Sequence, residues 1–230
     1  MPPARALKEP LSRDRVLAAG LSVADTDGLR AVTMRRVAEE LGCEAMTLYY
    51  YVDDKSGLLA GLTEAVIAEI AAAGLDPRLV ADAGDWREAV RRRCLAARQV
   101  MLRHPWAPSL VATQSQAPVT VIPLFEALVA TMVEGGCSYE LAHRAIHSLG
   151  SLLFGFTQEL FQPAADGEGA AADELEAMTL AMPHLSRLAE VAAHEVEGSL
   201  SMCDTQSEFE FTLCLILDGL EAHRRSDGTT

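Results

Sequence analysis

The chain has 230 residues, of which half are hydrophobic and only 5% aromatic, and its formal net charge is −14 at pH 7. A chain of this length can bury a core without disulfides or metals. Its apolar positions are mostly Ala, Leu and Val, which favours packed helices and argues against an all-β sandwich or barrel. The five cysteines are scattered and form no Cys-x-x-Cys pair, so neither a disulfide framework nor a zinc ribbon is expected. The sequence therefore predicts an all-α fold.

The strongly acidic balance speaks against a nucleic-acid partner for the chain as a whole. The charge is uneven, however: residues 1–60 carry 8 Lys and Arg against 9 Asp and Glu, whereas residues 61–230 carry 11 against 24. Any surface that binds an anion is therefore expected in the first quarter of the chain. Because the N-terminal segment has no apolar run and charges interrupt every long apolar stretch, we expect a cytoplasmic protein.

The first quarter has the pattern of a small helical domain. After a flexible tail over residues 1–10, Ser12 is expected to cap a helix that stops near residues 25–28. Thr33 caps a second, short helix that Gly42 ends in the left-handed conformation. A short turn then leads to residues 46–52, and two short helices joined in this way are typical of a helix-turn-helix motif. Asp53 and Asp54 are expected to cap a longer helix to Gly74, so this domain spans residues 11–73.

The rest of the chain, residues 80–225, predicts a larger helical body. Asp85 and Glu88 have capping-box spacing and open a helix that His104-Pro105 ends. Residues 163–173 have loop composition, and we expect poor order there. Four further helices are expected: one that ends at Gly135-Gly136, one from Ser138 to about residue 160, a weaker one over residues 180–196, and a last one with an apolar stripe at Phe209, Leu213, Ile216 and Leu220.

The run of three tyrosines at positions 49–51 is the least ordinary feature of the sequence. Consecutive helical residues point about 100° apart, so at least one ring must face outward. Together, segments 32–42, 46–52 and 55–59 resemble the DNA-binding head of the tetracycline repressor (TetR) family, over residues 11 to about 65. The resemblance implies an all-α homodimer that docks its third helix into one half-site of a palindromic operator. The DNA contacts that it implies are Arg35, Thr47, Tyr49, Tyr50 and Lys55. For Arg30 and Arg36, the alternative to a DNA contact is a salt-bridged position on the surface near Glu39 and Glu40.

The body is similar to the regulatory domain of the same family, at residues 86–87, 104–106, 136–138, 150–155 and 209–221. This likeness implies dimerisation through helices 138–161 and 206–223 and a ligand pocket within each body. The expected lining is mostly apolar: Trp86, Met101, His104, Trp106, Met132, His147, Phe154, Gln158 and Glu159. Where drug-binding members hold tetracycline and its magnesium, this chain has Ala71, Arg93, Ala97, Val111 and Ser151, and only Glu159 matches, so another effector is expected.

Two other hypotheses compete with a ligand-relieved repressor. His143 and His147 are four residues apart on one expected helix, a spacing that could present two imidazoles to a metal in a hydrolase. No third ligand is evident in the sequence, and nucleophile-elbow, P-loop and dinucleotide-binding motifs are missing. We therefore expect no enzymatic activity, metal or cofactor. The other hypothesis is a helical scaffold whose acidic body binds a basic partner; specific binding to duplex DNA separates the repressor from both.

Overall fold

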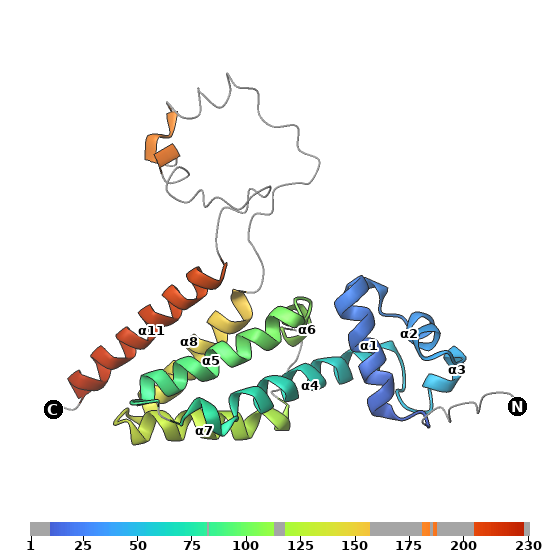
Figure 1. Cartoon of the computed structure of the whole chain (residues 1–230), viewed down its shortest axis with the longest axis horizontal. Coiled ribbons are helices and arrows are strands. Elements are labelled where there is room, and N and C mark those ends of the chain that lie inside the picture. Colours follow the sequence, from blue (N-terminus) through green and yellow to red (C-terminus); the bar gives the residue numbers. More distant parts are fainter. Residues whose placement is uncertain are drawn as a thin grey trace, which may run out of the picture.

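The computed structural model describes residues 10–81, 83–112, 118–156, 181–184, 186–187 and 205–227. Within these ranges every regular element is a helix, which confirms the predicted all-α class (Figure 1). The expected loop at 163–173 lies outside the described residues, as does most of the expected helix at 180–196. The described helices form a small head, which contains α1 to α3, and a larger body joined to it by α4.

Local capping sets the boundaries of the head helices. α1 (Arg13–Asp27) begins after Ser12, whose Oγ accepts a hydrogen bond from the Arg15 backbone N–H at 3.3 Å. α2 (Met34–Leu41) begins after Thr33, whose Oγ1 accepts from the Arg36 N–H at 3.1 Å. Gly42 follows in the left-handed conformation, with φ 64°, and turns the chain into α3 (Ala45–Leu48). These contacts confirm the helix-turn-helix prediction.

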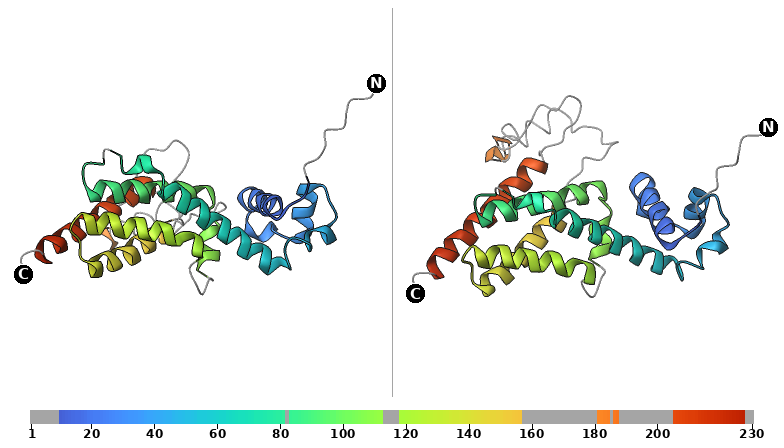
Figure 2. Two further views of the ribbon diagram at one scale, coloured as in Figure 1. Left: turned by 90° about the horizontal axis from the view of Figure 1, so that it is seen from below. Right: turned by 60° about the horizontal axis from the view of Figure 1, so that its bottom comes forward.

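The helix α4 (Lys55–Gly74) runs from the head into the body, as Figure 2 shows from two directions. Asp54 caps its N-terminus by accepting a hydrogen bond from the Gly57 N–H at 2.8 Å. Leu58 and Leu62 are fully buried in the head core, while Ile67 and Ile70 are buried further along. The length and apolar composition of α4 would also suit a membrane span, but these buried side chains make it the central core helix of the described fold.

The body is built on the long helix α5 (Trp86–Arg103), which Asp85 caps through the Glu88 N–H at 2.9 Å. α5 packs against α4 and also against α7 (Ile122–Glu134) and α8 (Tyr139–Gly155). A short helix, α6 (Ala107–Val111), follows α5 and contacts α4, and α11 (Thr205–Asp227) packs along α8. Ser138 caps α8 by accepting from the Leu141 N–H at 3.2 Å, as its place in the sequence predicts.

Apolar contacts and ion pairs together hold α11 against the body. Phe209 and Leu213 are fully buried in the core formed with α7 and α8. The guanidinium of Arg98, itself 1% exposed, lies 4.3 Å from the centre of the Phe209 ring. At the surface, Arg91 pairs with Glu210 across α5 and α11 at 2.7 Å. The sequence stripe on the last helix therefore marks its buried face.

Candidate DNA-binding surface and effector cavity

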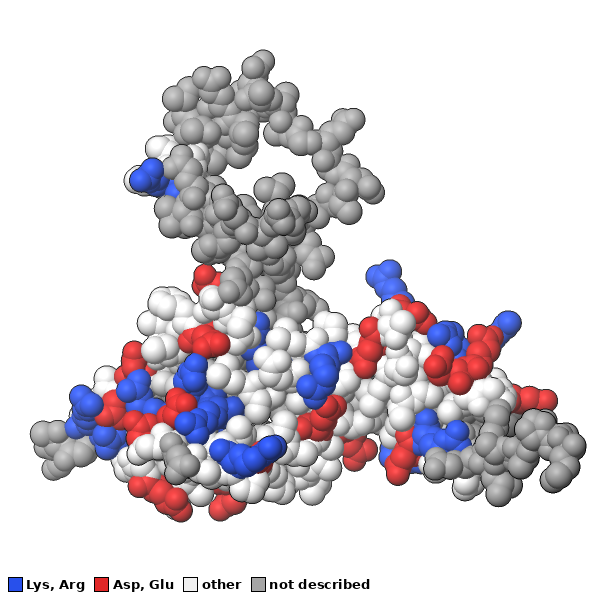
Figure 3. All heavy atoms as spheres, viewed as in Figure 1, with Lys and Arg blue, Asp and Glu red and all other residues white. Residues whose placement is uncertain are grey.

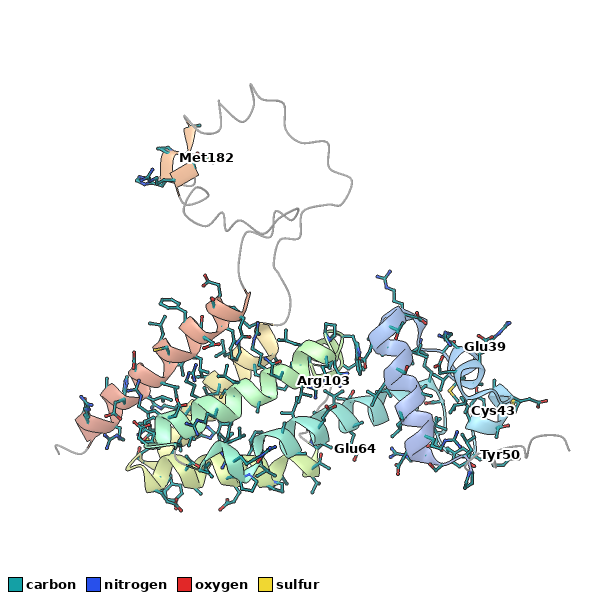
Figure 4. The ribbon with its side chains drawn as sticks, viewed as in Figure 1. Glu39, Cys43, Tyr50, Glu64, Arg103 and Met182 are labelled. Atoms are coloured by element: carbon teal, nitrogen blue, oxygen red, sulfur yellow. The ribbon has the colours of Figure 1, made fainter. Side chains whose placement is uncertain are left out.

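The helix α3 and the turn after it present the exposed face of the head. Leu48 is fully buried and Val52 is 6% exposed, so these two side chains anchor the segment to the head core. Between them, Tyr50 is 86% exposed and Tyr49 46% exposed, whereas Tyr51 packs partly against the core. Figure 4 shows Tyr50 at the end of the head that is remote from the body. The expectation that at least one tyrosine ring faces outward is confirmed.

The arginines of the head differ in the number of carboxylates with which they form ion pairs. Arg36 bonds to Asp27 at 3.0 Å and to Glu40 at 2.9 Å, and hydrogen bonds to these two carboxylates, first Glu40 and then Asp27, raise its pKa. Arg36 is therefore the salt-bridged surface residue of the alternative interpretation. Arg35 pairs with Glu39 at 2.9 Å but is 88% exposed.

The other two DNA-contact candidates also lie in the head. Lys55, at the exposed start of α4, has no ion-pair partner among the described residues. Thr47 is half-buried in α3. Acidic and basic side chains are intermixed over the face of the head seen in Figure 3. The roles of Arg35, Thr47, Tyr49, Tyr50 and Lys55 in DNA binding stay a prediction.

A cavity of about 810 Å³ lies in the body between α4, α5, α7 and α8. Its wall is mostly aliphatic and aromatic, as is usual for sites of drug-sized molecules. The polar side chains on the wall are Arg93, Cys94, His143, His147 and Ser151, and none of the described wall residues is acidic. The apolar part of the wall is formed by Ile67, Ile70, Ala97, Val111, Pro118, Val121, Leu124, Phe125, Leu128, Ile146, Leu149, Leu153 and Phe154, with Gly150.

The cavity wall and the nine residues expected to line a ligand pocket overlap in part. Of the nine candidates, His147 and Phe154 line the cavity, and Gln158 and Glu159 lie outside the described residues. The other five are absent from the cavity wall: three of them are buried core residues, and two belong to the contact between head and body. The first group is Trp86, Met101 and Met132, and the second is His104 and Trp106.

His143 and His147 contact each other edge to face with ring centroids 4.7 Å apart, and both line the cavity. In the part of the chain that the structure describes, no three His, Cys, Asp or Glu side chains converge on a point where a metal could bind.

Head and body are joined by a group of polar contacts that we call the junction cluster: Asp25, Glu69, Arg103, His104 and Trp106. The buried His104 bonds through Nδ1 to Asp25 Oδ1 of α1 at 2.8 Å and through Nε2 to Glu69 Oε2 of α4 at 3.0 Å. Trp106 Nε1 donates to the same Asp25 oxygen at 2.7 Å, and Arg103 pairs with Glu69. Burial raises the pKa of Glu69, but bonds from Arg103 and His104 outweigh it and lower the net value. The cluster ties the end of α5 to both the head and α4.

Two family models match the chain, one in each part. Residues 16–62 match the model described as bacterial regulatory proteins, tetR family, and residues 80–224 match the tetracyclin repressor-like C-terminal domain. The chain belongs to the TetR family. It is a helix-turn-helix transcriptional regulator, and the model for its regulatory domain covers all of the cavity wall on α5, α7 and α8.

Relatives and solved structures agree with this membership of the TetR family. The transcriptional repressor DrrR1 of Streptomyces coeruleorubidus is 30% identical over 98% of this chain and 84% of its own length. The class C tetracycline repressor of Escherichia coli is 28% identical over 93% of this chain and 92% of its own length.

Two solved structures from Streptomyces coelicolor are similar over nearly the whole chain. A possible TetR family transcriptional regulator has a TM-score of 0.71 and 29% identity, over 92% of this chain and 99% of its own. ActR in complex with actinorhodin has a TM-score of 0.67 and 25% identity, over 94% of this chain and 98% of its own.

Proposed function

We propose that this TetR family member is a dimeric repressor that a small, largely apolar effector releases from a palindromic operator. The observation that carries the proposal is that one helix, α4, belongs to both working parts of the molecule. Leu58 and Leu62 of α4 are buried in the head, and Ile67 and Ile70 of α4 form part of the cavity wall. A ligand that prefers one position of α4 therefore also prefers one position of the DNA-binding head.

The junction cluster supports the same coupling by a second route. α5 carries Arg93, Cys94 and Ala97 on the cavity wall, and His104 at its end bonds to Asp25 of the head. A shift of α5 on ligand binding would move the head relative to the body. Half-sites one helical turn apart, about 34 to 36 Å, require a fixed spacing between the two heads. A change in that spacing weakens operator binding without any change in the DNA-contacting residues.

The surfaces of α8 and α11 support homodimerisation. On α11, Phe211 is 61% exposed and Leu215 is 56% exposed. These two large apolar side chains lie one helical turn apart, and adjacent exposed apolar side chains often mark an interaction surface. Gly150 of α8 and Gly219 of α11 have no neighbouring atom within 4 Å of the position of a Cβ. Small residues allow two helices to approach closely, so a second copy of the chain fits this face in a four-helix interface.

The effector is expected to differ from tetracycline. Members that bind tetracycline hold the drug and its magnesium with histidines and neighbouring polar groups, and Ala71 and Val111 are among the residues at those positions here. Ala71 is buried and Val111 is on the cavity wall. Neither side chain can coordinate a metal or form a hydrogen bond. A hydrophobic molecule without a chelated metal suits such a wall better.

The experiment is a titration of the protein against labelled duplex from the region upstream of its own gene, by fluorescence anisotropy with competitor DNA and a salt series. Competitor-resistant binding of a dimer supports the proposal, whereas weak binding that any duplex abolishes contradicts it. Tyr50→Ala should weaken binding at least tenfold, because it removes a proposed DNA contact. The exposed ring does not pack in the head core, so the variant should still fold. The matched control is Tyr139→Ala, a tyrosine that is 74% exposed at the start of α8. Sedimentation of both variants checks that the dimer is intact.

A further inference from the structure

Arg93 on α5 is a cation on the wall of a mostly apolar cavity. The residue is only 8% exposed. One guanidinium nitrogen, Nη1, donates to the Gly74 carbonyl at the end of α4, and Nε is buried without a hydrogen-bond partner in the described structure. No carboxylate pairs with Arg93 among the described residues, and none lines the cavity. The guanidinium therefore lacks a counter-ion in the described part of the chain.

Such a charge is unusual because buried cations are normally paired with an acidic group. Burial lowers the pKa of Arg93, but a guanidinium remains protonated at neutral pH in proteins. The Gly74 carbonyl offsets part of the charge, since it lies at the negative end of the α4 dipole. The Gly74 carbonyl accepts from only one nitrogen of Arg93, however, and the planar guanidinium can form paired bonds with an anion of two oxygens.

We propose that the effector of this cavity is an organic anion, with a carboxylate or a chemically similar acidic group on an apolar skeleton, and that Arg93 binds the acidic group. The inference rests on the proposed function only in assuming that the cavity takes the effector. The volume of about 810 Å³ suits a molecule of several rings. The acidic group supplies the missing counter-ion, and the skeleton occupies the aliphatic wall.

The neighbours of Arg93 agree with this chemistry. Cys94 and Ala97 follow it on α5, and His143, His147 and Ser151 of α8 supply the remaining polar groups on the wall. Hydroxyl and imidazole groups can donate hydrogen bonds to the oxygens of an anion. An overall charge of −14 repels anions from the outer surface, so selectivity for an anion has to come from a local cation such as Arg93.

A matched pair of fluorescent probes tests the proposal without knowledge of the natural effector. The anionic probe is 1-anilinonaphthalene-8-sulfonate, and the neutral probe is N-phenyl-1-naphthylamine, which has the same skeleton without the sulfonate. Each probe is titrated into the full-length dimer, first wild type and then Arg93→Gln. We expect Arg93→Gln to weaken binding of the anionic probe at least tenfold and to change binding of the neutral probe less than twofold.

Three further variants separate the charge of Arg93 from its position and from the cavity around it. Arg93→Lys keeps the positive charge and should bind the anionic probe more tightly than Arg93→Gln does. Arg144→Gln removes an arginine whose side chain is 68% exposed on α8 and should leave both probes unaffected. Leu128→Trp fills part of the cavity and should weaken both probes, because Leu128 lines the wall. Circular dichroism establishes that each variant is folded.

The proposal is overturned if the wild type does not bind the anionic probe, or if Arg93→Gln changes both probes equally. The second result would make Arg93 a structural residue that ties α5 to the end of α4. Insensitivity of the anionic probe to Leu128→Trp would place it outside the cavity and would also overturn the proposal. None of these titrations contains DNA. A protein that binds its operator specifically but does not select the anionic probe would refute this inference alone. A protein that does not bind the operator specifically would refute the proposed function.

Discussion

The junction cluster makes a quantitative prediction about the link between head and body. His104 is 6% exposed and bonds to Asp25 of α1 at 2.8 Å and to Glu69 of α4 at 3.0 Å. A hydrogen bond to a charged group contributes about 1.5–3 kcal/mol to stability. Asp25 also accepts a hydrogen bond from Trp106 at 2.7 Å, and its side chain is 31% exposed. We therefore expect a coupling free energy between His104 and Asp25 of about 1.5–2 kcal/mol, near the lower end of that range.

A double-mutant cycle measures this coupling directly. The free energy of unfolding in urea is determined for the wild type, His104→Ala, Asp25→Ala and the double variant, all at one protein concentration because a dimer's stability depends on it. The loss of packing around His104 occurs in both arms of the cycle and cancels. A parallel cycle with Arg13→Ala and Glu64→Ala, an exposed ion pair at 3.7 Å in the head, serves as the control and should give less than about 0.5 kcal/mol.

The same variants test whether the cluster transmits the effector signal. If His104 couples the body to the head, His104→Ala should bind operator within about threefold of the wild type but require a higher effector concentration for release. A coupling free energy below about 0.3 kcal/mol would be within the usual error of additivity. That result, together with an unchanged release concentration, would show that the junction cluster does not transmit the effector signal.

Two further predictions follow from burial and capping. Thr33→Ala should lower the free energy of unfolding by about 1 kcal/mol, measured by urea titration, because the Thr33 hydroxyl satisfies the Arg36 N–H at the start of α2; Thr33→Ser should restore it. Burial raises the pKa of the Cys94 thiol to about 12, and the thiolate is the reactive form. At pH 8 Cys94 should therefore be alkylated by iodoacetamide at least a hundredfold more slowly in the folded protein than in urea, followed by mass spectrometry of its peptide. Equal alkylation rates in the folded protein and in urea would contradict the buried environment of the Cys94 thiol.

The boundaries of the helices could be predicted from the sequence because the interactions that set them are local. Ser12, Thr33, Asp54 and Asp85 each accept a hydrogen bond from the backbone N–H three residues later. Gly42 takes the left-handed conformation that few other residues adopt. Each of these contacts lies within four residues of the chain, so residue type and spacing are sufficient to predict it.

The wall of the cavity could not be predicted in the same way, because periodicity indicates that a side chain is buried but not what buries it. Met101 and Met132 are both almost fully buried, and each fits an apolar stripe as well as Phe154 does. Met101 packs in the core shared with the head, whereas Met132 packs against α8 and α11. The choice between core and cavity depends on the angles between helices, which a single sequence does not specify.

The sequence does contain a pattern that indicates the inward position of Arg93, one of the polar residues on the cavity wall. Residues 91–93 are three consecutive arginines on a helix, and consecutive side chains point about 100° apart. All three cannot lie on the solvent face of a helix that packs on several sides. Arg91 and Arg92 both reach Glu88 at the surface, at 3.8 and 2.8 Å, which leaves Arg93 facing inward. A charge placed inward by helical geometry, in a chain that could have used an apolar residue there, is evidence for a ligand of opposite charge.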